Sequence, residues 1–302
     1  DCSMCILSPK LVEAGRHLNI QLLTMSDVHS VEGEAGRFTV TVRERPRYVD
    51  MDKCIACGVC AEKCPRKVDD EFNEGLNSRK AAYVIYPQAV PLKYLIDADN
   101  CIYFEKGKCR ACEKFCPAGA IDLNQTAKMH QIQIGSIILA PGFKAFDPRG
   151  YDTYGFGTYP NVITSMQFER ILSASGPYEG HLERPSDRRS CQKIAWLQCI
   201  GSRDLHHGAH NYCSGVCCTY AIKEAVIAKE HSKEHLDTTI FFMDMRTYGK
   251  DFEQYYERAR QETGVRFVRS RVHSVEPAAP DSDDLRIIHV DEDGRLQDEV
   301  FD

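Results

Sequence analysis

The apolar and polar positions of this chain repeat one pattern in two places, near its start and near its end. Residues 19–42 and 264–290 each contain an apolar strand-like segment, the pentapeptide VHSVE, a polar turn and a strand of alternating hydrophobicity. Alternation with a period of two is typical of half-buried β-strands, so both stretches predict strand–turn–strand units. One pentapeptide could arise by chance, but the shared frame around residues 28–32 and 272–276 indicates an internal duplication.

The second half of the chain predicts a parallel β-α-β unit. Residues 193–198 and 238–246 are short apolar runs that we expect to be buried strands. Residues 217–236, between them, have helical spacing, and the expected apolar face consists of Tyr220, Ile222, Ala225, Val226 and Ala228. Strand, loop, helix and strand in this order indicate a Rossmann unit. The loop lacks the usual G-x-G-x-x-G and reads CIGSRDLHHGAHNYCSGVCC instead.

The apolar run IQIGSIILAPGF, residues 132–143, predicts one more strand with a turn at its end. Two Rossmann-like halves that each close in a β-meander resemble the flavoprotein disulfide reductases with two dinucleotide domains. In that family a strand of the meander ends in a turn that approaches the flavin. The resemblance places Ala140, Pro141 and Gly142 next to FAD, whereas APGF taken alone is an ordinary strand-ending turn.

Length and composition narrow the function classes. The chain has 302 residues, enough for two or three domains, and its net charge of −6 argues against a nucleic-acid partner. We expect no membrane span, because no apolar run approaches the ~20 residues that a bilayer requires. The sequence begins DCSMC, with neither a start methionine nor a signal peptide, so we expect an internal fragment of a cytoplasmic protein.

Fifteen cysteines give the chain its chemistry. They are clustered in a long chain without an export signal, a pattern that favours metal ligation in a reducing compartment over disulfides. The stretch CIACGVCAEKCP has the C-x2-C-x2-C-x3-C-P spacing of two-cluster ferredoxins, whose fourth cysteine binds the other cluster. A second copy, CIYFEKGKCRACEKFCP, has a longer first spacing and an intact C-x2-C-x3-C-P.

Crosswise ligation then predicts two 4Fe-4S clusters. The first set of ligands is Cys54, Cys57, Cys60 and Cys116, and the second set is Cys64, Cys101, Cys109 and Cys112. Two structural zinc sites are the alternative, since four cysteines often bind zinc. Zinc, however, requires neither the distal C-P nor a second copy of the same plan, so the spacing favours iron–sulfur clusters.

The loop of the predicted Rossmann unit holds four further cysteines. Ligands bind at the carboxyl ends of strands and the N-termini of helices in such sheets, and a helix N-terminus favours negative charge. We therefore predict a third 4Fe-4S cluster held by Cys199, Cys213, Cys217 and Cys218. Buried inert thiols, a zinc site and a redox dithiol are the alternatives. We do not include His206, His207 and His210 as ligands, and we expect Cys191 to be a buried thiol.

Several longer motifs resemble the A-type subunit of heterodisulfide reductase, and the resemblance runs along essentially the whole chain. They are DCSMCILSPKLVE, RPRYVDMDKC, YPNVITSMQFERILSASGP, RPSD, QCIGSRD and YCSGVCCTYAIK. The resemblance implies a flavoprotein that performs flavin-based electron bifurcation. Its implied partners are the other subunits of such a complex, a hydrogenase or formate dehydrogenase module, and ferredoxin.

The same resemblance implies a fold and further site residues. The expected fold class is α/β: a thioredoxin-reductase-like flavoprotein with two dinucleotide domains and an inserted α+β ferredoxin domain. The expected domains are a partial FAD domain (1–47 and 127–190), the ferredoxin domain (48–126) and a second Rossmann-like domain (191–302). Lys223 matches a lysine near the reactive flavin nitrogen and Glu169 a carboxylate on the same side, where a cation would stabilise reduced flavin. Without the resemblance, both are ordinary surface residues of amphipathic helices.

Three functional hypotheses follow. The first is an electron-bifurcating subunit, the second a flavin and iron–sulfur conduit that does not bifurcate and is linked to quinone, and the third a zinc-stabilised scaffold. Cys2 and Cys5 form a C-x-x-C pair that would bind a further, shared cluster, form a redox dithiol, or serve as structural thiols.

Overall fold

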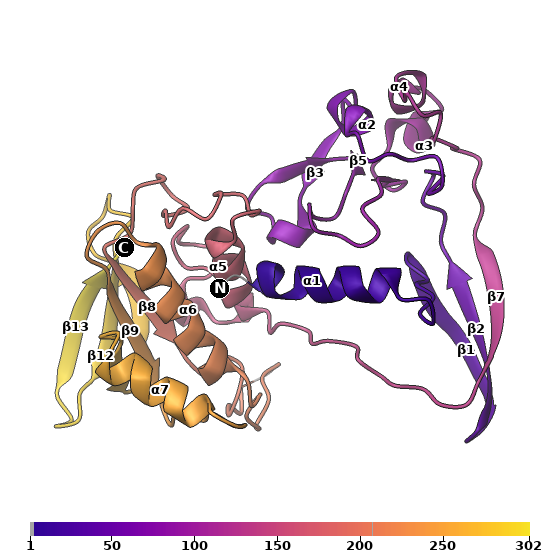
Figure 1. Ribbon diagram of the computed structural model, residues 1–302. Coiled ribbons are helices and arrows are strands. Elements are labelled where there is room, and N and C mark those ends of the chain that lie inside the picture. Colours follow the sequence, from indigo (N-terminus) through magenta and orange to yellow (C-terminus); the bar gives the residue numbers. More distant parts are fainter. Residues whose placement is uncertain (1–2, 207) are drawn as a thin grey trace. The chain divides into compact units, whose positions relative to one another are not determined.

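The computed structural model describes residues 3–206 and 208–302, and the chain divides into two compact units, Asp1–Gly142 and Phe143–Asp302 (Figure 1). Among the described residues, no helix is both long and apolar enough to cross a membrane.

The first unit begins with helix α1 (Ser3–Arg16) and contains a three-stranded antiparallel sheet. The strand order is β1 (Ser26–Glu34), β2 (Arg37–Glu44), β7 (Lys128–Ile134), with Val31 opposite Val40 and Val40 opposite Ile132 (Figure 1). The β1–β2 turn contains Gly36, whose φ of +88° is a conformation that favours glycine. The VHSVE pentapeptide thus lies within β1 itself, and 19–24, expected to be a strand, has no regular structure.

The other copy of VHSVE lies in an equivalent sheet of the second unit. This sheet has the order β11 (Ser274–Pro277), β12 (Leu285–Val290), β13 (Leu296–Phe301), again antiparallel throughout. In both sheets the pentapeptide contributes to an edge strand, the next strand is central, and a third strand closes the meander. The shared order supports the duplication that the sequence pattern predicts.

The structure corrects the strand that the sequence predicts over 132–143. Strand β7 ends at Ile134, and residues 136–147 have no helix or strand. Ile138 and Leu139 are 92% and 84% exposed. An apolar run forms a strand only when a neighbouring strand takes up its backbone hydrogen bonds, and among the described residues none pairs with this segment. Ala140, Pro141 and Gly142 therefore follow an irregular segment.

The long connection between β2 and β7 forms a small cysteine-rich subdomain of short elements (Figure 1). The helices are α2 (Val59–Glu62), the single 3-10 turn Glu71–Asn73, α3 (Ile102–Lys106) and α4 (Ala111–Lys114). The strands pair as β3 (Lys67–Asp69) with β4 (Ser78–Lys80), and β5 (Ala82–Tyr83) with β6 (Leu95–Ile96). An antiparallel bridge between Val49 and Ile121 joins the two ends of the subdomain. Its buried core includes Val49, Ile121, Leu123 and several cysteines.

The second unit contains the β-α-β unit that the sequence predicts. Parallel strands β8 (Lys193–Leu197), β9 (Asp237–Phe242) and β10 (Arg266–Arg269) form a sheet of order β10-β9-β8. Helix α6 (Cys217–His231) connects β8 to β9, and α7 (Phe252–Gln261) connects β9 to β10. The predicted strand 238–246 is shorter than expected, because β9 ends at Phe242.

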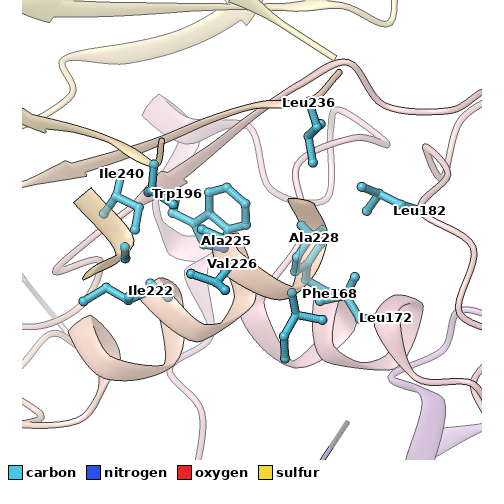
Figure 2. Close-up of a cluster of buried hydrophobic side chains, with 14 residues drawn as sticks. Phe168, Leu172, Leu182, Trp196, Ile222, Ala225, Val226, Ala228, Leu236 and Ile240 are labelled. Atoms are coloured by element: carbon cyan, nitrogen blue, oxygen red, sulfur yellow. The ribbon is translucent and has the colours of Figure 1, made fainter. Parts of the chain in front are cut away.

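Helix α5 (Ser165–Leu172) packs in the same core. A capping box between Thr164 and Gln167 fixes the start of α5. Figure 2 shows Phe168 and Leu172 beside α6, with Trp196 of β8 on the sheet side of that helix. Two short 3-10 turns, Pro148–Gly150 and Asp152–Tyr154, precede α5. Because α5 packs with the Rossmann core, 143–190 belongs to the second compact unit, and the expected domain assignment stays a prediction.

Candidate iron–sulfur sites

The first predicted set of four cysteines surrounds one cavity. A cavity that is partly open to solvent lies in the cysteine-rich subdomain. Its lining includes Cys54, Cys57, Cys60, Cys116, Tyr94 and Pro117. Positive φ angles at Ala56 (58°) and Gly58 (83°) turn the CIACG loop around this space. The Tyr94 hydroxyl would lie 3.2 Å from a Cβ at position 58, so glycine also allows this close approach.

Cys116 reaches this cavity because the two ends of the subdomain pair with each other. The Asp50 N–H donates to the Ala120 carbonyl at 2.7 Å, and the Asp122 N–H donates to the Tyr48 carbonyl at 3.1 Å. The Ala120 N–H also donates to Sγ of Cys116 at 3.3 Å. Backbone pairing therefore places the distal thiol beside three thiols that are far away in the sequence.

The second predicted set lies together in the same subdomain. Burial raises the pKa of the Cys112 thiol to about 11, and the nearby Cys101, Cys64 and Cys109 thiols contribute to the increase. Cys101 immediately precedes α3, Cys112 lies in α4, and Cys109 has a φ of 79° in the loop between these helices. Charges on Cys112 and Cys116 both influence Cys60, so the two sets are neighbours.

The third predicted set lies where β8 ends and α6 begins. Strand β8 ends at Leu197, Cys199 follows it, and Cys217 and Cys218 are the first two residues of α6. The Gly215 N–H donates to Sγ of Cys213 at 3.3 Å. The thiols of Cys217 and Cys213 both affect the pKa of Cys199, which burial raises. All four thiols are thus brought to the mouth of the Rossmann unit.

The electrostatics of the third site favour a thiolate at the start of the helix. A hydrogen bond from the Cys218 thiol lowers the pKa of Cys217 to about 6, with further contributions from nearby hydrogen-bond donors. The helix N-terminus adds a favourable field for negative charge. The Cys218 thiol in turn lies 3.9 Å from the carbonyl oxygen of Asp244.

The loop before this helix contains residues whose backbone conformations cost energy for any residue with a side chain. Cys199 and Arg203 have φ angles of 63° and 56°, in the left-handed region. Gly201 has a φ of 73°, and a Cβ there would overlap the ring of Phe146. Strained residues are concentrated at functional sites.

The arrangement of the first set of thiols suits a cluster. Among the residues that the structure describes, no three histidine, cysteine or acidic side chains converge as ligands of one metal ion. A zinc ion holds its sulfur ligands at about 2.3 Å around one point. The cysteines of the first set instead surround a cavity, and each ligand of a 4Fe-4S cluster binds a different iron.

Two of the residues predicted to contact flavin form an ion pair. Nζ of Lys223 on α6 lies 2.7 Å from Oε1 of Glu169 on α5, and each side chain is about one-quarter exposed. Ala140, Pro141 and Gly142 belong to the other compact unit, so their assignment to FAD stays a prediction.

The remaining sequence candidates have other surroundings. Burial raises the pKa of Cys191 to about 12, and this thiol packs against the Rossmann core. His206 pairs with Asp204, and His210 stacks on Tyr212. Cys2 and His207 lie outside the described residues, as does the side chain of Cys5.

Sequence reasoning missed several charged residues close to the sites. Glu224 is 1% exposed within α6, and Arg203, Asp244 and Arg246 form ion pairs beside the third set of cysteines. Arg203 stands in the cysteine-rich loop, but Asp244 follows a different strand. No local spacing indicates that these residues meet.

Comparison with known proteins identifies an iron–sulfur motif and related subunits. Residues 47–68 match the 4Fe-4S binding domain family. Over 90% of its length, the chain is 44% identical to the A-type iron–sulfur subunit of the CoB--CoM heterodisulfide reductase of Methanocaldococcus jannaschii. It is 42% identical over the same share to the A-type subunit of the H(2):CoB-CoM heterodisulfide,ferredoxin reductase of Methanothermobacter marburgensis. It is 41% identical over 91% of its length to the A-type subunit of the Ferredoxin/F(420)H(2)-dependent CoB-CoM heterodisulfide reductase of Methanosarcina acetivorans.

The chain spans 40% of the length of the first two relatives and 34% of the third. The resemblance that the sequence motifs indicate is therefore confirmed. Nine-tenths of this chain is homologous to a segment of the A-type subunit of heterodisulfide reductase.

Proposed function

We propose that this chain is the iron–sulfur segment of a heterodisulfide reductase-type oxidoreductase, and that it carries electrons through three 4Fe-4S clusters to and from FAD. The observation that carries the proposal is the cavity surrounded by Cys54, Cys57, Cys60 and Cys116. Its four thiols are the set that crosswise ferredoxin ligation requires.

The described residues suit electron transfer at these sites. A 4Fe-4S cluster, when bound, accepts and releases single electrons. The cysteines hold it, backbone N–H groups donate to ligand sulfurs at Cys116 and Cys213, and the buried Cys54 and Cys60 lie away from water. The nearness of the first two sets gives electrons a short path between two clusters.

FAD, when bound, would supply the division of an electron pair between ferredoxin and a disulfide-reducing partner protein. Lys223 would stand near the reactive flavin nitrogen, with Glu169 holding its ammonium in place. A hydrogenase or formate dehydrogenase module would supply the pair, in keeping with the relative from Methanococcus maripaludis, whose name is that of an H(2)/formate:CoB-CoM heterodisulfide,ferredoxin reductase.

A second candidate is an electron conduit without bifurcation. The relative from Methanosarcina acetivorans carries a name in which ferredoxin and F(420)H(2) are the reductants. Electron donors therefore differ among proteins that are similarly related to this chain. Coupled reduction of ferredoxin and a second acceptor by one flavin separates the two candidates.

Iron analysis of the anaerobically purified protein tests the cluster proposal. We expect about four irons fewer in Cys116→Ser than in the parent protein, because one cluster loses a ligand. Cys191→Ser, which removes a buried thiol outside the three sets, should retain its iron. Stoichiometric zinc in place of iron, or equal iron in Cys116→Ser and the parent, would refute the proposal.

A further inference from the structure

Asp244 anchors two arginines beside the third set of cysteines. It lies two residues beyond the end of β9, at the carboxyl edge of the parallel sheet. Its Oδ2 lies 2.7 Å from Nη1 of Arg203 and 3.4 Å from Nη2 of Arg246. Arg203 belongs to the loop after β8, so one carboxylate joins two separate segments at the mouth of the Rossmann unit.

Each of these arginines is close to a different ligand cysteine. The positive charge of Arg203, four residues after Cys199 in the same loop, acts on the Cys199 thiol. Arg246 interacts electrostatically with Cys213. The two guanidinium groups therefore each lie near a different cysteine of the set.

The backbone around Asp244 contacts the set as well. The Asp244 carbonyl accepts from Sγ of Cys218, and the Arg246 N–H approaches the same thiol. The segment 244–246 is thus bound to the site by its main chain and not only by its side chains. This fixes the Asp244 carboxylate, and with it the two guanidinium groups.

Arg203 is held in a largely buried position at this place. Its side chain is three-quarters buried, and Nη1 lies 2.7 Å from the Asp244 carboxylate. The residue also holds a φ of 56°, which costs energy for a non-glycine residue. A buried cationic donor in a strained loop next to a ligand thiol fits an anionic group between the four cysteines.

We propose that Arg203 and Arg246, held by Asp244, set the reduction potential of the cluster bound by Cys199, Cys213, Cys217 and Cys218. The inference rests on the proposed function, which supplies this cluster. Reduction adds one negative charge to an already anionic thiolate cluster. Nearby cations and hydrogen bonds to the sulfurs stabilise the reduced form and raise the potential. The Asp244 carboxylate offsets part of that effect while fixing the arginines in place.

An EPR-monitored redox titration of the anaerobically purified holoprotein tests the inference. The signal of this cluster is the one that Cys213→Ser abolishes. We expect Arg203→Gln to lower the ratio of reduced to oxidised cluster about tenfold at a fixed potential, which corresponds to ~59 mV for one electron. Arg246→Gln should shift the potential in the same direction, and Arg203→Lys, which keeps the charge, should shift it less.

Arg269→Gln is the matched control. Arg269 is also an arginine facing Asp244, at 3.9 Å, but its side chain is 70% exposed. Its removal should leave the potential of the cluster unchanged. A shift as large as that of Arg203→Gln would overturn the inference, because general loss of positive charge would then explain both variants.

The outcomes separate this inference from the proposed function. If the parent protein has no EPR signal that Cys213→Ser abolishes, the third cluster is absent and the proposed function fails at this site. If the cluster is present and both Arg203→Gln and Arg246→Gln keep its potential, only the tuning role is wrong. If Arg203→Gln loses the cluster, the same redox titration of Arg246→Gln decides whether the arginines set the potential. Loss of the cluster in both variants would overturn tuning in favour of a structural role.

Discussion

The indole of Trp196 donates a 2.8 Å hydrogen bond from Nε1 to Oε2 of Glu224. Trp196 lies on β8, and Glu224 lies on α6, one residue after Lys223. Glu224 is 1% exposed, and its other carboxyl oxygen has no hydrogen-bond partner among the described residues. Burial raises the pKa of Glu224 well above its ordinary value, so the group is protonated where an exposed glutamate is ionised.

We expect this buried acid to make the protein less stable as pH rises. Because the folded pKa is raised, the folded state binds more protons than the unfolded state above the ordinary pKa of 4.5. The contribution of Glu224 to the free energy of unfolding is therefore fully present below that value. It declines as the pH rises towards the folded pKa, by up to ~1.4 kcal/mol per pH unit. Glu224→Gln retains an acceptor for Trp196 and cannot ionise.

Urea unfolding of the parent and Glu224→Gln between pH 5 and pH 8 measures this difference. The variant should gain stability relative to the parent as the pH increases. Glu230→Gln, on the exposed end of the same helix, should show no such trend. A constant difference across the range would mean that Glu224 is ionised in the folded protein.

The Lys223–Glu169 ion pair predicts a kinetic effect larger than its stabilising effect. The pair is partly exposed, so we expect Lys223→Ala to cost only about 1 kcal/mol of unfolding free energy. If Lys223 stabilises reduced flavin, the same change should slow electron transfer from the flavin by about 10²-fold. Stopped-flow flavin oxidation with the native acceptors measures this rate.

Lys229→Ala serves as the comparison, since Lys229 lies on the same helix and its ammonium donates to the Leu236 carbonyl at 2.7 Å. This variant should transfer electrons at the parental rate. Unchanged flavin kinetics in Lys223→Ala would show that its assignment to the flavin is wrong.

Gly201 should tolerate no side chain. Its φ of 73° is unfavourable for alanine, and a Cβ would overlap the Phe146 ring. We expect Gly201→Ala to destabilise the protein by about 2–3 kcal/mol and to lower the occupancy of the third cluster, measured by thermal unfolding and iron content.

Gly208→Ala is the control that measures the cost of the backbone conformation without a side-chain overlap. Gly208 has a φ of 82°, and a Cβ there would have nothing within 4 Å. Gly208→Ala should therefore cost about 1 kcal/mol. Equal losses in the two variants would show that contact with Phe146 plays no part.

The buried side chain of Ile121 should govern retention of the first cluster. Ile121 is 8% exposed and lines the cavity beside Cys116. We expect Ile121→Ala to cost about 2–4 kcal/mol by leaving a cavity, and to speed the release of about four irons to a chelator. Absorbance of the iron–chelator complex follows this release.

Ile138→Ala, at a position 92% exposed, should release iron at the parental rate. Equal release from both clusters of the subdomain in Ile121→Ala would instead indicate that the whole subdomain unfolds together.

The sequence by itself determined the local chemistry of this protein. Cysteine spacing is set within a few residues, so C-x2-C-x2-C-x3-C-P indicates ligands without knowledge of the fold. Hydrophobic periodicity is also local, and it predicted β8, α6 and the start of β9 from apolar positions alone. The same local reasoning failed at 136–143, because an apolar run becomes a strand only when a neighbour pairs with it.

Only the tertiary structure decided which distant residues meet. Cys116 reaches the cavity of Cys54 through backbone pairing of residues 48–50 with 120–122, and no spacing rule contains that pairing. Burial likewise depends on the packing of α5, α6 and the sheet, and it alone turns Glu224 from a surface acid into a neutral one. The ion pair between Arg203 and Asp244 joins two loops at one edge of the sheet, because parallel strands bring their carboxyl ends together.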